Sequence, residues 1–400
     1  MVQNLILKKP IKKNMSKIKK SNKKQPLRLG FIGGGLSSTI GEAHYTASHL
    51  DGHWQLNSGF FSRKKSVNYK TAKSWNVSLN RTYESLNKFI SKETYKLDAV
   101  VVLTPTPNHY ETILKLVKKK IPIICEKPLV SSLKQAKIIQ KLIKKSNGFL
   151  TVTYNYTGYP MVRELRQRVI NGSLGKIKQI HFEMPQDALI NSNSKIKKWR
   201  LYDEEIPTIC LDLGVHLHNL AYFILEKEPK KVMANFFNSS RHKKIIDNVL
   251  MWLEYKNGMK GSFWMSKTAI GNRNGLRLRI FGDKGSAEWI QNNSEELRLS
   301  YKNGTREILD RASKSTISSK KRYNRYKAGH PAGFIEAFAN LYFDIADNLN
   351  SYNNRKKNKS IYVFDLDHSL RGLELFAASC KSNCSRNWKK INYSNRESYF

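Results

Sequence analysis

The sequence predicts an α/β fold, in which a doubly wound parallel sheet is followed by an α+β domain with an open, largely antiparallel sheet. Three observations support this prediction. A short apolar run ends in three consecutive glycines and is followed by a helical pattern. Strand-sized apolar runs then alternate with helical patterns as far as residue 153, which is the order that gives right-handed crossovers and parallel strands. Beyond that point strand patterns follow one another, and several are separated by Asn-Gly, Gly-Asn or Asp-Lys-Gly turns.

Residues 1–26 differ in composition from the rest of the chain. They contain nine lysines, no arginine and no acidic residue, and their apolar residues are scattered. A secretory signal needs a longer apolar block, and a mitochondrial presequence favours arginine on an amphipathic face. We therefore expect a solvated, disordered basic tail.

The first domain is expected at 27–153, as a dinucleotide-binding unit of the Rossmann type. The apolar runs that predict its strands are 27–32, 55–61, 98–103, 122–125 and 149–153. The patterns that predict its helices lie around 40–50, 66–75, 83–90, 109–119 and 133–145.

The second domain is expected at 154–390. Its predicted strands are 177–184, 231–237, 248–255, 260–265, 276–281 and 286–291. Its predicted helices are 161–170, 333–349 and 363–379. The segment 311–327 is rich in Ser, Lys and Arg and has no acidic residue, so we expect a surface loop.

Composition excludes several classes of protein. With 40% hydrophobic residues, the 400-residue chain can form sizeable cores, and no apolar stretch is long enough for a membrane helix. Four cysteines without a CxxC pair indicate neither a disulfide framework nor a zinc ribbon, so we expect no metal and a reducing cytoplasm. The net charge of +40 is spread along the whole chain, which favours a compositional bias over a nucleic-acid site.

The glycine turn is the first candidate site. Gly33 and Gly35 let a pyrophosphate approach the backbone, and the following helix offers its N-terminal N–H groups and dipole to the negative charge. The spacing departs from G-x-G-x-x-G by a three-residue insertion. The residues that we expect in this lengthened phosphate loop are Ser37, Ser38, Thr39 and Ile40.

The end of the second strand bears on the choice of cofactor. An acidic residue there would accept from the ribose 2′-hydroxyl of NAD, whereas a cation favours the 2′-phosphate of NADP. The sequence has Phe61-Ser62-Arg63 followed by two lysines. Both cofactors stay open, and the residues favour NADP.

Two segments carry a resemblance to a known family. The box Glu126-Lys127-Pro128, after the predicted strand 122–125, and Thr104-Pro105-Thr106-Pro107-Asn108-His109, after the strand before it, resemble the Gfo/Idh/MocA oxidoreductases. The resemblance runs from about 27 to 387. Further matching segments are 152–163, 172–177, 212–216 and 329–340.

The resemblance implies an NAD(P)-dependent oxidoreductase that acts on a secondary alcohol or ketone of a sugar, an inositol or a related polyol. It implies Lys127, Asp212 and His216 as the catalytic residues. In a doubly wound sheet, strands end at the crevice that binds the ligand. The cofactor-binding residues expected at these strand ends are Thr104, Pro105, Asn108, His109, Glu126 and Lys127.

Asp212 and His216 are four residues apart, so on a helical turn they share a face, and histidine suits general acid/base work near neutral pH. His44 and His218 are the competing histidines. We expect His44 to support the glycine loop and His218 to pack between helices.

Aromatic faces and polar side chains suit a sugar pocket. The candidates for its wall are Tyr154, Asn155, Tyr156, Trp199 and Arg200. Related proteins usually carry several glycines shortly before the aspartate that Asp212 matches, whereas this chain has the less flexible segment 204–210.

Two other functions fit the same sequence. One is an NAD-dependent glycosidase of this family, which oxidises its sugar transiently. The other is a non-catalytic sugar-sensing regulator. The resemblance also implies a homodimer or homotetramer.

Overall fold

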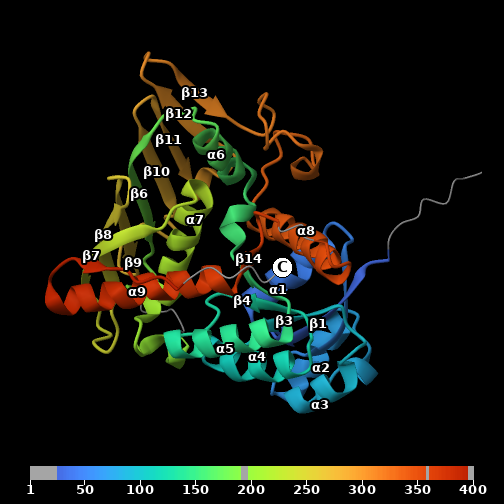
Figure 1. Ribbon diagram of the computed structural model, residues 1–400. Helices are drawn as coiled ribbons and strands as arrows, with labels where there is room; N and C mark the ends of the chain where they lie inside the picture. Colours follow the sequence, from blue (N-terminus) through green and yellow to red (C-terminus); the bar gives the residue numbers. More distant parts are fainter. Residues whose placement is uncertain (1–24, 191–196, 357–359, 395–400) are drawn as a thin grey trace, which may run out of the picture.

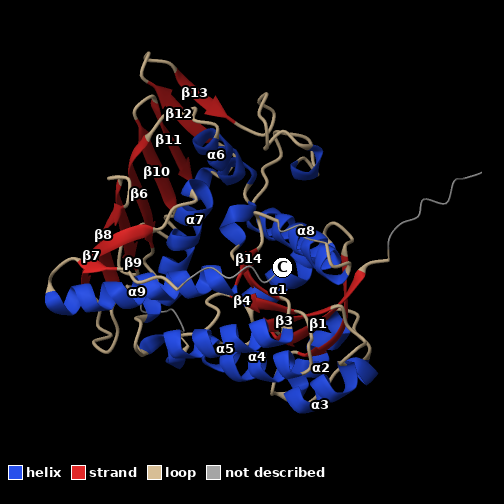
Figure 2. Cartoon of the chain, viewed as in Figure 1, coloured by secondary structure: helices blue, strands red, loops and turns tan. Residues whose placement is uncertain are grey.

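The computed structural model describes residues 25–190, 197–356 and 360–394, and Figures 1 and 2 show two sheets with helices packed against them. The predicted basic tail lies outside the described residues except for Gln25 and Pro26. None of the helices in the described ranges is both long and apolar enough to cross a bilayer.

The first sheet has the strand order β14-β5-β4-β3-β1-β2, and all neighbours are parallel except β14 with β5. Its strands are β1 (Leu27–Gly33), β2 (Trp54–Phe60), β3 (Ala99–Leu103), β4 (Ile123–Glu126), β5 (Leu150–Thr153) and β14 (Phe364–Asp365). The helices between them are α1 (Thr39–His49), α2 (Lys65–Ser74), α3 (Leu86–Glu93), α4 (His109–Lys118) and α5 (Leu133–Ser146). The predicted doubly wound parallel sheet is confirmed.

The order of these strands reverses at β1, which lies between β2 and β3. The chain therefore crosses from β1 to β2 on one side and then to β3 on the other side of β1. The loops that follow β1 and β3 diverge from each other as a result. Gly33 is paired with Leu103 at this edge. A crevice at such a reversal is where open α/β sheets bind their ligands.

The second sheet has the order β13-β12-β11-β10-β6-β9-β8-β7-β15 and is antiparallel except for the pair β6 and β9. Its strands are β6 (Ile177–Pro185), β7 (Pro229–Phe237), β8 (Asn248–Tyr255), β9 (Lys260–Ser266), β10 (Arg277–Gly282), β11 (Gly285–Ile290), β12 (Leu297–Tyr301), β13 (Arg306–Leu309) and β15 (Lys389–Lys390). The helices α6 (Pro160–Ile170), α7 (Val215–Leu225) and α9 (Leu366–Ser385) lie along one face (Figure 2). The predicted open, largely antiparallel sheet is also confirmed.

Short helical turns join these elements. They are η1 (Leu79–Arg81), η2 (Thr106–Asn108), η3 (Asn155–Gly158), η4 (Lys198–Leu201), η6 (Gln291–Asn293) and η7 (Lys321–Tyr323), together with the π-helical turn η5 (Cys210–Gly214). The π-helical turn runs directly into α7, so Asp212 and His216 lie on consecutive helical segments.

The chain returns to the first sheet near its C-terminus. Helix α8 (Phe334–Asn353) packs on the sheet face that also carries α1, where the indole N–H of Trp54 donates to the carbonyl of Tyr342 at 2.9 Å. Strand β14 then adds to the edge of the same sheet. The predicted segment 154–390 therefore contributes to both sheets.

The segment 311–327, predicted as a surface loop, is anchored in the interior. Arg311 is buried and donates to Glu295 and to the carbonyl of Tyr323, which is buried as well. The buried guanidinium group of Arg311 needs these acceptors, because an unpaired charge is costly to bury. The high content of Lys and Arg in this loop concealed these anchors.

Candidate active site

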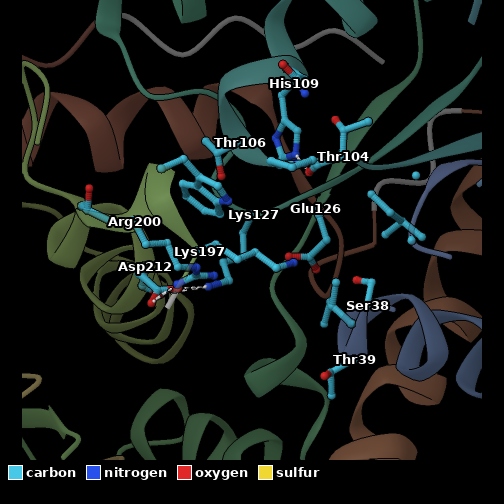
Figure 3. A pocket seen from close by; sticks show the side chains of 18 of the residues that line it. Ser38, Thr39, Thr104, Thr106, His109, Glu126, Lys127, Lys197, Arg200 and Asp212 are labelled. Carbon is cyan, nitrogen blue, oxygen red and sulfur yellow. Dashed lines mark hydrogen bonds and ion pairs between the residues drawn. The ribbon is translucent and has the colours of Figure 1, made fainter. Parts of the chain in front are cut away.

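A cavity of about 960 Å³ opens between the glycine turn and the start of α7. Residues from both halves of the chain line it, and Figure 3 shows the glycine-turn side, with Ser38 and Thr39, across from Arg200 and Asp212. A ligand bound there would contact both halves of the molecule.

The glycine turn has no room for larger side chains. Gly33 and Gly34 have φ values of +84° and +73°, which side chains disfavour, and a Cβ on Gly41 would lie 1.7 Å from the carbonyl oxygen of Gly34. Ser38 is the N-cap of α1, and its hydroxyl accepts from the N–H of Gly41 at 3.4 Å. The turn therefore presents a helix N-terminus at close range, which suits a pyrophosphate.

The loop after β2 is held against this turn. Asn68 accepts from the N–H groups of Phe61 and Ser62, and the carbonyl of Phe61 accepts from Gly35. Ser62 and Arg63 consequently line the cavity where an adenosine ribose would follow the pyrophosphate.

His109 joins the ends of β3 and β4. Its Nε2 lies 2.8 Å from the carbonyl oxygen of Thr104, and its Nδ1 lies 2.9 Å from that of Pro128. Burial lowers the pKa of His109, which favours the neutral ring. The hydroxyl of Thr104 is buried and has no hydrogen-bond partner among the described residues, so it is free to bind a ligand.

Glu126 is a buried carboxylate with a structural network around it. Thr153 donates to its Oε1 at 2.6 Å, and Nε2 of His44 lies 3.0 Å from the same oxygen. The other ring nitrogen of His44 contacts the hydroxyl of Tyr342. Burial would raise the pKa of Glu126, but the hydrogen bond and charge of His44 outweigh it and lower that pKa. Glu126 thus fixes the backbone from which Lys127 projects, and the Lys127–Pro128 peptide bond is cis.

Lys127 reaches Asp212 across the cavity. Its ammonium lies 2.9 Å from the backbone oxygen of Asp212 and 3.1 Å from the side-chain Oδ1. The other carboxylate oxygen lies 2.7 Å from Arg200 and 2.5 Å from Lys267 (Figure 3 shows Asp212 and Arg200 in contact). Burial would raise the pKa of Asp212, but the charges of Lys267, Lys127 and Arg200 hold it well below its usual range.

His216 lies behind this cluster. It is buried, its ring meets Tyr156 edge to face at a centroid distance of 4.6 Å, and its Nδ1 has no partner among the described residues. Burial and the nearby charge of Lys127 hold the pKa of His216 well below its usual value, against the opposite effect of Asp212. The ring is therefore neutral at neutral pH and can accept a proton.

Most of the residues predicted for the site share this cavity. Those in its lining are Gly33, Gly35, Ser37, Ser38, Thr39, Ile40, Ser62, Arg63, Thr104, Pro105, Asn108, His109, Glu126, Lys127, Trp199, Arg200 and Asp212. The structure does not bring His216, Tyr154, Asn155 or Tyr156 into that lining. Tyr154 packs in the core and donates to Ser369. Asn155 is buried, and its amide nitrogen has no partner within the described ranges.

Sequence reasoning missed Lys267 and Lys197, which also line the cavity. Lys267 follows β9, and its buried ammonium contacts Asp212. Its position just after a strand was the available signal, but the abundance of lysine in this chain masked it. His44 and His218 lie outside the lining, and His218 pairs with Glu228 at 3.0 Å.

Comparisons with known proteins agree with this arrangement. Residues 27–154 match the oxidoreductase family model with an NAD-binding Rossmann fold, and residues 162–288 match the GFO/IDH/MocA C-terminal domain. The uncharacterized oxidoreductase YfiI of Bacillus subtilis is 27% identical over 370 residues, which is 87% of this chain and 92% of that protein.

Solved structures share the whole fold. An oxidoreductase from Sinorhizobium meliloti is 30% identical with a TM-score of 0.80, covering 91% of this chain and 99% of that one. An inositol dehydrogenase homolog from Azotobacter vinelandii, complexed with NADH and myo-inositol, is 23% identical with a TM-score of 0.85, covering 92% and 98%. With both of its domain models matched, this chain belongs to the Gfo/Idh/MocA family of NAD-binding oxidoreductases.

Proposed function

We propose that this protein is an NAD(P)-dependent dehydrogenase or reductase that acts on a secondary alcohol or ketone of a sugar, an inositol or a related polyol. The observation that carries the proposal is the contact of Lys127 with Asp212 inside the cavity that also holds the glycine turn. One residue comes from each half of the molecule, so a substrate at their contact would lie beside a dinucleotide bound to the first sheet.

The residues of the cavity fit a nicotinamide dinucleotide. The glycine turn and the N-terminus of α1 would hold the pyrophosphate, Ser62 and Arg63 the adenosine ribose, and the unpaired hydroxyl of Thr104 the end nearer Lys127. When bound, the nicotinamide ring would accept or supply the hydride.

Three side chains would handle the substrate hydroxyl. The ammonium of Lys127 would stabilise the negative charge that develops on the oxygen, because it is held in place before the reaction begins. Asp212 positions that ammonium. His216 lies behind Asp212 and outside the cavity lining, and its neutral imidazole would take the proton or return it where the substrate reaches it, which is the role of a general base or acid.

The cofactor preference that we infer is NADP. Ser62 and Arg63 line the cavity after β2, and no acidic residue lies between positions 61 and 65 to repel a 2′-phosphate. A comparison of KM for NAD and for NADP with one substrate tests this preference.

The test of the proposed function is an assay of nicotinamide absorbance, with both cofactors, against a panel of sugars, inositols and their derivatives. With the substrate found, Lys127→Ala and His216→Ala should each lower kcat by about 100-fold or more, in the range known for general acid/base and electrostatic groups. Binding of the reduced cofactor, followed by fluorescence, should persist.

A matched control is Lys118→Ala, which removes an exposed lysine from the last turn of α4. Its kcat should equal that of the unmodified protein. Near-normal rates in both Lys127→Ala and His216→Ala would contradict the assignment of these residues.

A further inference from the structure

The charges around Asp212 do not balance. Of the side chains that the structure describes, three cations contact its single carboxylate, those of Lys127, Arg200 and Lys267. Lys267 is largely buried, with a side chain only 13% exposed, so solvent compensates little of its charge. Two positive charges therefore remain at this end of the cavity, and the ammonium of Lys197 at its rim adds to them.

The other carboxylates of the described lining do not supply the missing negative charge. Glu126 lies on the glycine-turn side of Lys127, away from Arg200, and its Oε1 contacts His44 and Thr153 (Figure 3). Glu111 is an exposed residue in the first turn of α4. Just outside the lining, Asp203 accepts from the backbone N–H groups of Thr208 and Ile246. None of these three carboxylates forms a hydrogen bond or an ion pair with Arg200 or Lys267 among the described residues.

The unused hydrogen-bonding groups of Arg200, Lys267 and Trp199 are all donors. Asp212 takes one N–H of the five on the Arg200 guanidinium and one of the three on the Lys267 ammonium. Beside them, the indole nitrogen of Trp199 is buried and has no acceptor among the described residues. Arg200 lies over the Trp199 ring with 4.7 Å between the guanidinium carbon and the ring centroid. A neutral sugar hydroxyl both donates and accepts, whereas a phosphoryl group only accepts.

This cluster lies away from the part of the cavity that suits the cofactor phosphates. Figure 3 places Ser38 and Thr39 of the glycine turn on one side of Glu126 and Lys127, and Arg200, Lys197 and Asp212 on the other. Arg200, Lys197 and Lys267 all come from the chain after residue 154. Their charge is consequently directed at the substrate.

We propose that the substrate is a phosphate monoester of a sugar or polyol, whose phosphoryl group binds between Arg200, Lys267 and Trp199 while its reacting hydroxyl lies at Lys127. This inference rests on the proposed function and narrows its substrate class. A phosphate monoester carries nearly two negative charges at neutral pH, which matches the two charges that Asp212 leaves unpaired. Arg in particular suits the oxygens of a phosphoryl group.

The first experiment measures binding of inorganic phosphate to the protein saturated with NADH or NADPH, so that the glycine turn is already occupied. A change in the fluorescence of the bound cofactor, as phosphate is added, reports binding in the cavity. Arg200→Gln and Lys267→Gln should each weaken this binding by about tenfold, equivalent to about 1.4 kcal/mol. The matched controls Arg298→Gln and Lys260→Gln, on exposed parts of β12 and β9, should leave it unchanged.

If Lys267→Gln does not fold, Lys267→Arg keeps the charge and should retain phosphate binding, while Arg200→Gln alone should still lose it. Phosphate binding that is unaffected by every Arg200 and Lys267 variant would overturn the proposal.

The second experiment compares turnover of matched pairs, such as D-glucose 6-phosphate with D-glucose and an inositol monophosphate with the free inositol. The phosphorylated member should have the higher kcat/KM, and Arg200→Gln should remove that advantage mainly through KM. Equal use of both members, or a preference for D-glucuronate over D-glucose 6-phosphate, would exclude the phosphate while leaving the dehydrogenase function intact. Phosphate binding without oxidation of any compound would instead count against the dehydrogenase function.

Discussion

His216 is the residue at which burial has the clearest chemical consequence. An ordinary histidine has a pKa of about 6.5, and burial together with Lys127 places the pKa of His216 well below that value in the folded protein. Below about pH 6.5 the unfolded chain therefore binds a proton at this position that the folded chain does not bind. Stability from this group is complete above that pH and is lost as the pH falls toward the folded-state pKa.

This difference gives a testable pH dependence of stability. As the pH falls from about 6.5 to the folded-state pKa of His216, this residue should lower the free energy of unfolding by up to about 1.4 kcal/mol for each pH unit. His216→Gln should reduce the slope of the free energy of unfolding against pH by that amount. Urea unfolding at several pH values measures this slope. The exposed His330→Gln is the control, and equal slopes for the two variants would refute the burial argument.

The residues of the site differed in how well the sequence revealed them. Glu126 and Lys127 stand in a motif that follows a predicted strand, and Asp212 stands in a second motif that carries the family resemblance. The resemblance therefore led us to expect Lys127 and Asp212 in one site. Lys267 carries no motif, and its role depends on β9 running parallel to β6, a pairing that the turns between strands did not indicate. Tyr154 and Tyr156 directly follow β5, one of the strands of the first sheet. At the turn η3, however, both side chains are buried in the core and do not line the cavity.

At the scale of elements, the glycine turn depends on the absence of a side chain at the start of α1. Gly41→Ala would place a methyl group against the carbonyl oxygen of Gly34. The clash is with a backbone atom, so it cannot be relieved by turning a side chain. We expect a loss of stability of about 1–3 kcal/mol, as in other overpacked sites, and a marked loss of cofactor affinity. Thermal unfolding and the fluorescence of bound NADH or NADPH measure the two effects.

Gly333→Ala is the matched control for that substitution. A Cβ there would have its nearest neighbour, Glu336, at 3.8 Å, and the backbone is not in the left-handed region. Its cofactor affinity should be unchanged. Unchanged affinity in Gly41→Ala as well would mean that this turn does not hold the cofactor.

Most elements with a strong local pattern were predicted within a few residues, but the apolar helix α7 was missed. Elements created by tertiary contacts were missed as well. The strands β12 and β13 were missed, although Asn303-Gly304 between them is a hairpin signal and Gly304 has a φ of +88°. Strand β14 has only two residues and forms because the chain passes the edge of β5. Such pairings have no periodicity that a sequence can display.

At the scale of the whole molecule, the site is divided between two halves that α8 and β14 lock together. Arg163 of α6 forms a fully buried ion pair with Asp344 of α8 at 2.7 Å, and Asp344 also pairs with Arg322. Because charges buried in this way are costly to separate, the halves should move little relative to each other. The contact of Lys127 with Asp212 can then be positioned before any ligand binds.

The second sheet also has a face that the helices do not cover. Large apolar side chains on β7 and β8 point to this face, where Trp252 is 56% exposed and lies opposite Met233, and Leu250 lies two residues along the same strand. Exposed apolar surface of this kind marks an interface, and the resemblance to the family implied an oligomer. We therefore expect two copies of the chain to associate through this face.

Salt dependence separates this association from a charge-driven one. A net charge of +40 repels two copies, so added salt should strengthen an apolar contact by screening that repulsion, whereas it would weaken a contact made by ion pairs. Light scattering should show a dimer or larger assembly that Trp252→Arg dissociates. Leu79→Arg, at an exposed leucine in η1 of the first domain, should leave the assembly intact. A monomer at every salt concentration would exclude the interface, and an assembly that salt dissociates would place the contact on charged surface elsewhere.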